Sequence, residues 1–276
     1  MGNDNDTQYT FEKTTYMYTS KLQSIYILTI GLCIFQCVWI TWKPLYILIS
    51  PILNSSESSQ QVTYKSLLQK LDGPLLPPKL IAKYEGQTLV HLTHIWPGLL
   101  WSGSIPFQLH PSLRKNHPRT HRIIGRIFMF SSLMIHLGFI VIMSKGLFFE
   151  NFLENENDVT LIPFVRVSSA SLSVSVLALW FLYTGLMALW YARQRNIQLH
   201  QYYIIRHIGS GIWISFQRVL LLIYVTFRNT VVGVDQPPLV RPRDAFGMSA
   251  TIAIIVSVSL SEYTVFMFKQ ICVKKE

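Results

Sequence analysis

Apolar runs of about 20 residues recur along the whole chain, and their length constrains the fold more than any other feature. A helix needs about 20 apolar residues to cross a hydrocarbon core of about 30 Å. Charged residues make up only 14% of the chain, about half the share that is usual in a soluble domain. The sequence therefore predicts an all-α protein, a polytopic transmembrane helical bundle.

We expect about six transmembrane helices. Their predicted ranges are 24–42, 89–109, 121–144, 168–192, 204–227 and 246–268. This transmembrane domain, 24–268, lies between an N-terminal tail, 1–23, and a C-terminal tail, 269–276, both predicted to be cytoplasmic. Residues 43–88 are the predicted long outer loop, in which Asn54 begins a glycosylation sequon.

The positions of the basic residues predict that both termini face the cytoplasm. Short loops weigh most in the positive-inside rule, and both short loops on the predicted inner side are densely basic. The formal net charge of the chain is +10, and its basic residues cluster at the ends of the apolar runs. This distribution does not indicate a nucleic-acid partner. The expected partner is the lipid bilayer, although the sequence does not identify which membrane.

Titratable side chains within the predicted spans fall into two layers. Such groups are costly at membrane depth and are candidate functional residues. A rise of about 1.5 Å per residue places the outer layer, His94, His136 and Arg218, at nearly one depth. The inner layer lies at the inner boundary and comprises His121, Arg126, His200, Arg206 and His207. The alternative is that these groups only form hydrogen bonds between helices.

Arg218 lies too far from either end of its span for its charge to be explained by snorkelling alone. It therefore needs an anionic or hydrogen-bonding partner inside the bundle. Glu262 differs from it in depth by about 12 Å, which is too far for a direct pair. We expect Arg218 to face a cavity together with His94 and His136.

Three of the histidines are followed by glycine four residues later, namely His94, His121 and His207. Positions four apart share one helix face, so each glycine leaves room for a large planar group beside the imidazole. Glycine also packs transmembrane helices closely, and this second explanation stays open. The spacing favours a flat cofactor.

Other chemistry has less support in the sequence. The inner loop contains histidines that could converge on zinc, but it is rich in Arg and Lys and has no carboxylate, so its field repels a bare cation. We therefore expect no metal site there, and an anion such as a phosphate or carboxylate suits the loop better. No motif of a hydrolase nucleophile, a zinc protease or a phosphate-binding loop occurs.

Three segments carry a resemblance to a known family: HIWPGLLWSGSIPFQ, HRIIGRIF, and LHQYYIIRHI with a later arginine. Over residues 89–224 the chain resembles the predicted membrane proteins grouped as domain of unknown function 2306. The matching positions are His94, Gly103, Gln108, His121, Arg122, Gly125, Arg126, His200, Arg206 and Arg218. The order Pro106-Phe107-Gln108 departs from the G-P-x-Q-F order usual in that family. The resemblance implies no activity, because the family is named for lacking one.

The arrangement of the histidines is similar to that in membrane b-type cytochromes, which hold haem between neighbouring helices. One hypothesis is therefore transmembrane electron transfer through haem b, an oxidoreductase of cytochrome-b type. The two outer-layer histidines would hold the outer haem, and His121 with His200 or His207 the inner one. The arginines of both layers would neutralise propionates or an anionic electron donor. The alternatives are a cofactor-free transporter or lipid- or anion-binding bundle, and a membrane scaffold or assembly factor.

Overall fold

The structure is a computed structural model, and it describes residues 20–41, 83–84, 86–149, 170–231 and 242–273. Every regular element within these ranges is a helix, which confirms the all-α membrane bundle. The glycosylation sequon at Asn54, nearly all of the predicted outer loop, most of the predicted N-terminal tail and residues 274–276 of the C-terminal tail lie outside the described residues.

The described helices follow the chain in the predicted order. The first helix spans Ser20–Thr41. The next rod, 88–109, consists of α4 (Thr88–Val90), the π-helical turn η1 (His91–Ile95) and α5 (Trp96–Leu109). After the short α6 (Pro111–Asn116) come α7 (Pro118–Ser144), α8 (Ala170–Arg193), α9 (Ile197–Val231) and α10 (Pro242–Val273).

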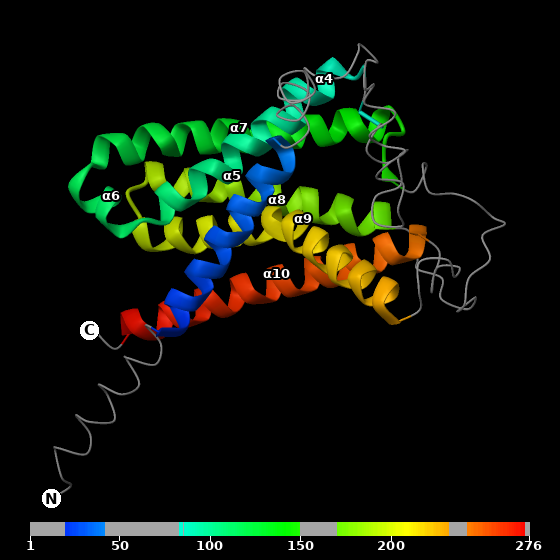
Figure 1. The fold of residues 1–276 in the computed structure, drawn as a ribbon. Coiled ribbons are helices and arrows are strands. Elements are labelled where there is room, and N and C mark those ends of the chain that lie inside the picture. The colour runs from blue at the N-terminus through cyan, green and yellow to red at the C-terminus, as the bar shows by residue number, and fades with distance from the viewer. Residues whose placement is uncertain (1–19, 42–82, 85, 150–169, 232–241, 274–276) are drawn as a thin grey trace, which may run out of the picture.

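Five of the helices described are long and apolar enough to cross a membrane: the first helix, α7, α8, α9 and α10. The remaining predicted span is present as the rod 88–109, which η1 interrupts and which lies along α7 (Figure 1). The predicted helix ends hold within a few residues, except that α9 begins at Ile197 instead of 204.

Helices that are neighbours in the sequence pack side by side: α5 on α7, α8 on α9, and α9 on α10 (Figure 1). The first helix contacts both α5 and α9, since Cys37 faces Gly103 and Gln36 accepts a hydrogen bond from Ser215 at 2.9 Å. The start of the first helix and the end of α10 lie at the same end of the bundle as α6, as an even number of crossings requires (Figure 1). The cytoplasmic orientation of this end stays a prediction.

An aromatic cluster joins four of the helices at the centre of the bundle. The Trp101 ring of α5 lies 5.6 Å from that of Phe128 in α7 and 5.8 Å from that of Phe181 in α8. Ile208 and Ile212 of α9 complete the same buried cluster. These contacts fix the positions of the helices that surround the candidate site.

Gly138 of α7 lies against the backbone of η1. A Cβ atom there would be 2.6 Å from His94 Cβ and 2.8 Å from the Thr93 carbonyl oxygen. Gly138→Ala is therefore expected to separate η1 from α7 and to lower the free energy of unfolding by about 1–3 kcal/mol, measured as a fall in Tm. Gly31→Ala in the first helix is the matched control, because nothing lies within 4 Å of a Cβ added there. An unchanged Tm for Gly138→Ala would contradict this close packing.

Candidate functional site

A cavity of about 360 Å³ lies inside the bundle. Small-molecule sites usually have volumes of about 300–1,000 Å³. Every long helix contributes to its lining, as do η1 and, before α4, Lys83 and Tyr84. Much of the wall is aromatic, and includes Trp39, Trp101, Phe139, Phe181, Trp213 and Phe246. Such a wall suits an apolar ligand body.

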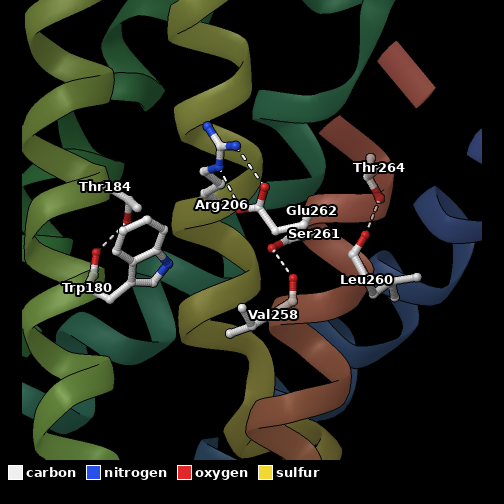
Figure 2. A network of polar contacts seen from close by, with 8 residues as sticks. All are labelled: Trp180, Thr184, Arg206, Val258, Leu260, Ser261, Glu262 and Thr264. Carbon is white, nitrogen blue, oxygen red and sulfur yellow. Dashed lines mark hydrogen bonds and ion pairs between the residues drawn. The ribbon is translucent and has the colours of Figure 1, made fainter. Parts of the chain in front are cut away.

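The structure brings the three outer-layer residues together. His94 of η1, His136 of α7 and Arg218 of α9 all line this one cavity. Glu262 of α10 is bound elsewhere, because both of its carboxylate oxygens accept hydrogen bonds from Arg206, at 2.6 and 2.7 Å (Figure 2). The prediction that Arg218 faces a cavity with the two histidines, and does not pair with Glu262, is confirmed.

The guanidinium of Arg218 is held between two aromatic rings. Its Cζ atom lies 5.0 Å from the centre of the Phe246 ring and 5.5 Å from that of Trp39. Cation–π contacts of this kind orient the planar guanidinium group but give its N–H groups no hydrogen-bond acceptor. The Nε and Nη1 atoms are buried and have no hydrogen-bond partner among the described residues. Arg218 is therefore a preformed cation with unused donors at the cavity.

Lys83 is a second cation at the cavity. Its ammonium lies 4.6 Å from the centre of the Tyr84 ring. Burial, followed by the positive charge of Arg218, lowers the pKa of Lys83 to about 7. Lys83 could not be recognised from the sequence as a site residue, because it precedes the second span in a loop and only the fold brings it near Arg218. No acidic residue occurs among the described residues that line the cavity.

The segment that carries Lys83 is anchored to the bundle. The Tyr84 carbonyl accepts hydrogen bonds from His91 Nε2 at 3.0 Å and from the Gln87 backbone N–H at 3.1 Å. Gln87 Oε1 in turn accepts a hydrogen bond from Lys145 Nζ at 2.8 Å. These contacts hold Lys83 beside η1 and the end of α7.

The π-helical turn η1 has a cause in the sequence. Pro97 has no backbone N–H, so the Thr93 carbonyl lacks its usual donor, and the Trp96 N–H bonds instead to the His91 carbonyl. Such turns are frequent at functional sites. His94 lies in this turn and donates from Nδ1 to the Ile135 carbonyl at 3.1 Å, which leaves its Nε2 without that role.

His136 contributes a further polar atom to the cavity. Its Nδ1 is buried and has no hydrogen-bond partner of good geometry within the described ranges, although the Ala178 carbonyl lies near the ring. The outer layer therefore supplies unused polar atoms from two helices, on His136 and on Arg218.

None of the inner-layer residues is among the described residues that line the cavity. His121 lies near His200, and its buried Nδ1 has no hydrogen-bond partner among the described residues. Arg126 is exposed, and Arg206 is bound to Glu262. His200 donates from Nδ1 to the Ala188 carbonyl at 2.8 Å. His207 contacts Ser132, Trp101 and Phe181 in the middle parts of α7, α5 and α8, so it lies deeper in the bundle than the predicted inner layer.

His207 is instead a buried core residue with both ring nitrogens engaged. Its Nδ1 donates to the Phe181 carbonyl at 2.9 Å. Its Nε2 lies 2.8 Å from Ser132 Oγ and 3.4 Å from the indole nitrogen of Trp101, which donates to it. Neither nitrogen is left to bind an iron atom. This residue matches the alternative in which polar groups join helices.

The space beside the three glycines is filled by protein side chains. A Cβ on Gly98 would lie 3.7 Å from Ile40, and one on Gly125 would lie 3.3 Å from the Gln108 side chain. A Cβ on Gly211 would overlap the Trp101 ring. The backbones of η1 and α7 are also in contact at Gly138, between His94 and His136. The room that the sequence predicted beside these glycines for a flat cofactor is therefore taken by protein atoms.

Gln108 and Gly125, two of the positions that carry the resemblance, lie against each other. Gln108 of α5 donates from Nε2 to the His121 carbonyl at 3.0 Å, and its side chain packs on Gly125. This contact joins α5 to α7 across the turn that contains α6 (Figure 1).

Within the described ranges, no three His, Cys, Asp or Glu side chains gather closely enough to hold a metal ion.

Comparisons with known proteins do not assign the chain to a family. No family model matches it, and neither a curated protein nor a solved structure does.

Proposed function

We propose that this integral membrane protein binds a small amphipathic anion in the cavity, as a cofactor-free transporter or as an anion- or lipid-binding bundle. The observation that carries the proposal is the guanidinium of Arg218, whose Nε and Nη1 are buried without a partner among the described residues. A buried charge without a partner is costly, and an anion in the cavity removes that cost.

The shape of the guanidinium favours an oxyanion. Arg presents its N–H groups as a rigid fork, which matches two oxygens of a carboxylate or phosphate. Phe246 and Trp39 restrict the orientation of this fork. A small anion would therefore meet preformed donors and would not have to reorganise the site.

The aromatic wall favours an apolar body attached to the anionic group. Trp101 and Phe181 line the cavity on the side toward the core cluster, and Trp213 lines it from α9. Apolar burial stabilises binding by about 25 cal/mol per Å² of surface removed from water. An amphipathic ligand uses both the charge and the wall, whereas an inorganic anion uses only the charge.

A matched series of short ligands tests the proposal. We expect hexanoate and hexyl phosphate to bind to the purified protein in lipid nanodiscs, measured by calorimetry after subtraction of partitioning into empty nanodiscs. Hexylammonium has the same apolar chain with the opposite charge, and we expect no binding because Lys83 and Arg218 repel it. Binding of hexylammonium as tight as that of the anions would contradict the proposal.

A further inference from the structure

Two positive charges border the cavity from separate parts of the chain. Lys83 precedes α4, and Arg218 lies in α9. The other titratable residues among the described lining are Tyr84 beside Lys83, His91 and His94 of η1, and His136 of α7. Like charges that are shielded from water repel each other strongly. A ligand with two negative charges offsets this repulsion, whereas a monoanion offsets only part of it.

We infer that the ligand is a phosphate monoester on an apolar body, with its dianionic headgroup between Lys83 and Arg218. The inference rests on the proposed function and specifies its ligand class. A monoester phosphate has three terminal oxygens, so two can pair with the guanidinium fork while one accepts from the ammonium. A carboxylate has only two oxygens and one charge, and it leaves one of the cations without compensation.

Between Arg218 and the centre of the bundle, the cavity has room for the apolar part of the ligand. Arg218 and Ser210 of α9 both line the cavity, and they are separated by about 12 Å along the helix axis. Trp101 and Phe181 line its inner part, where they join the buried core cluster. The phosphate therefore lies toward the outer end of the cavity, and the apolar chain extends toward the centre of the bundle.

Binding of such a dianion is linked to the protonation of Lys83. In the empty cavity the pKa of Lys83 is lowered to about 7, so its amine is largely neutral at pH 8. A phosphate beside it raises that pKa, and binding above pH 7 therefore takes up a proton. Affinity falls as the pH rises from about 7 toward the pKa of the bound state, by up to about tenfold per pH unit.

The other ionising groups do not mask this change between pH 7.5 and 9. A phosphate monoester loses its second proton near pH 6, so it is already a dianion throughout this range. An ordinary histidine has a pKa of about 6.5 and is mostly neutral there. Arg218 is an arginine and keeps its charge, so the decline in affinity reports Lys83.

Hexyl phosphate and hexyl sulfate form the matched pair of ligands for the test. They share a tetrahedral headgroup and an apolar chain, but between pH 7.5 and 9 the sulfate carries one charge and the phosphate two. We expect the full-length protein in nanodiscs to bind hexyl phosphate at least tenfold more tightly than hexyl sulfate at pH 7.5. We also expect the phosphate affinity to fall steeply between pH 7.5 and 9.

Variants of Lys83 separate its charge from its titration. Lys83→Gln is expected to lose both the preference for phosphate and the fall in affinity with pH. Lys83→Arg is expected to keep the preference and lose the pH dependence, because arginine does not titrate in this range. Lys115→Gln is the control, since Lys115 lies in α6 outside the cavity lining and should leave both properties unchanged.

The outcomes distinguish this inference from the proposed function. Equal affinities for sulfate and phosphate, unaffected by Lys83→Gln, would overturn the dianion while anion binding stands. If neither anion binds, the proposed function itself fails. Phosphatidate added to the nanodiscs identifies the source of the headgroup: displacement of hexyl phosphate indicates a lipid, and no displacement indicates a water-soluble monoester.

Discussion

Arg218→Leu is expected to weaken the binding of hexyl phosphate by about a hundredfold or more. The variant removes two charge-assisted hydrogen bonds, each worth about 1.5–3 kcal/mol. It also removes a buried cation with two unpaired donors, so the free energy of unfolding without ligand should stay the same or rise. Calorimetry measures the first effect, and Tm in nanodiscs measures the second.

Two further variants show whether this loss belongs to the site. Arg218→Lys keeps the charge but not the fork, and should recover only part of the affinity. Arg126→Gln is the matched control, because Arg126 is exposed on α7 and does not line the cavity. Wild-type affinity in Arg218→Leu would contradict the assignment, and so would a loss of binding that merely follows unfolding.

His207→Leu is expected to lower the free energy of unfolding by about 2–4 kcal/mol. The imidazole is 1% exposed, and its loss leaves the Phe181 carbonyl and the Trp101 indole N–H without these partners. The Phe181 and His207 rings also lie only 4.1 Å apart, centre to centre. A fall in Tm measures the effect, and the protein that remains folded should still bind hexyl phosphate.

His117→Leu is the control for this substitution, because His117 is exposed in the turn before α7. It should leave Tm unchanged. If His207→Leu were as stable as the wild type, the hydrogen bonds to Phe181 and Trp101 would not hold the core. If it folded normally but lost binding, His207 would belong to the functional site and not to the core.

The outer layer could be predicted from the sequence because three helices place its residues by simple geometry. The depths of His94, His136 and Arg218 follow from the rise per residue and from approximate helix ends. Arg218 also lies far from both ends of α9, a helix of 35 residues. Membrane depth therefore predicted which polar groups share the cavity.

The inner layer was not predicted as the structure places it, because the sequence does not specify which side chains meet. Arg206 pairs with Glu262 of α10, and His207 lies among Phe128, Trp101 and Phe181. The start of α9 was also missed: the helix begins at Ile197, two residues after Arg195, which has a left-handed φ of 60°. An apolar run marks where a helix enters hydrocarbon, but not where the helix begins.

The glycine pattern shows a second limit of sequence reasoning. A glycine leaves room beside a helix, but the sequence does not say what fills that room. At Gly211 the Trp101 ring fills it, and at Gly125 the side chain of Gln108 does. Lys83 shows the converse, because the fold brings a loop lysine to an arginine that lies far away in the sequence.

Solid-state NMR tests directly whether Arg218 holds the anionic headgroup of a ligand inside the bundle. The measurement is the dipolar coupling between the ³¹P nucleus of bound hexyl phosphate and ¹⁵N-labelled arginine side chains. We expect a coupling to one guanidinium that disappears in Arg218→Lys and persists in Arg126→Gln. A coupling that survives Arg218→Lys, or none at saturating ligand, would contradict the role of Arg218.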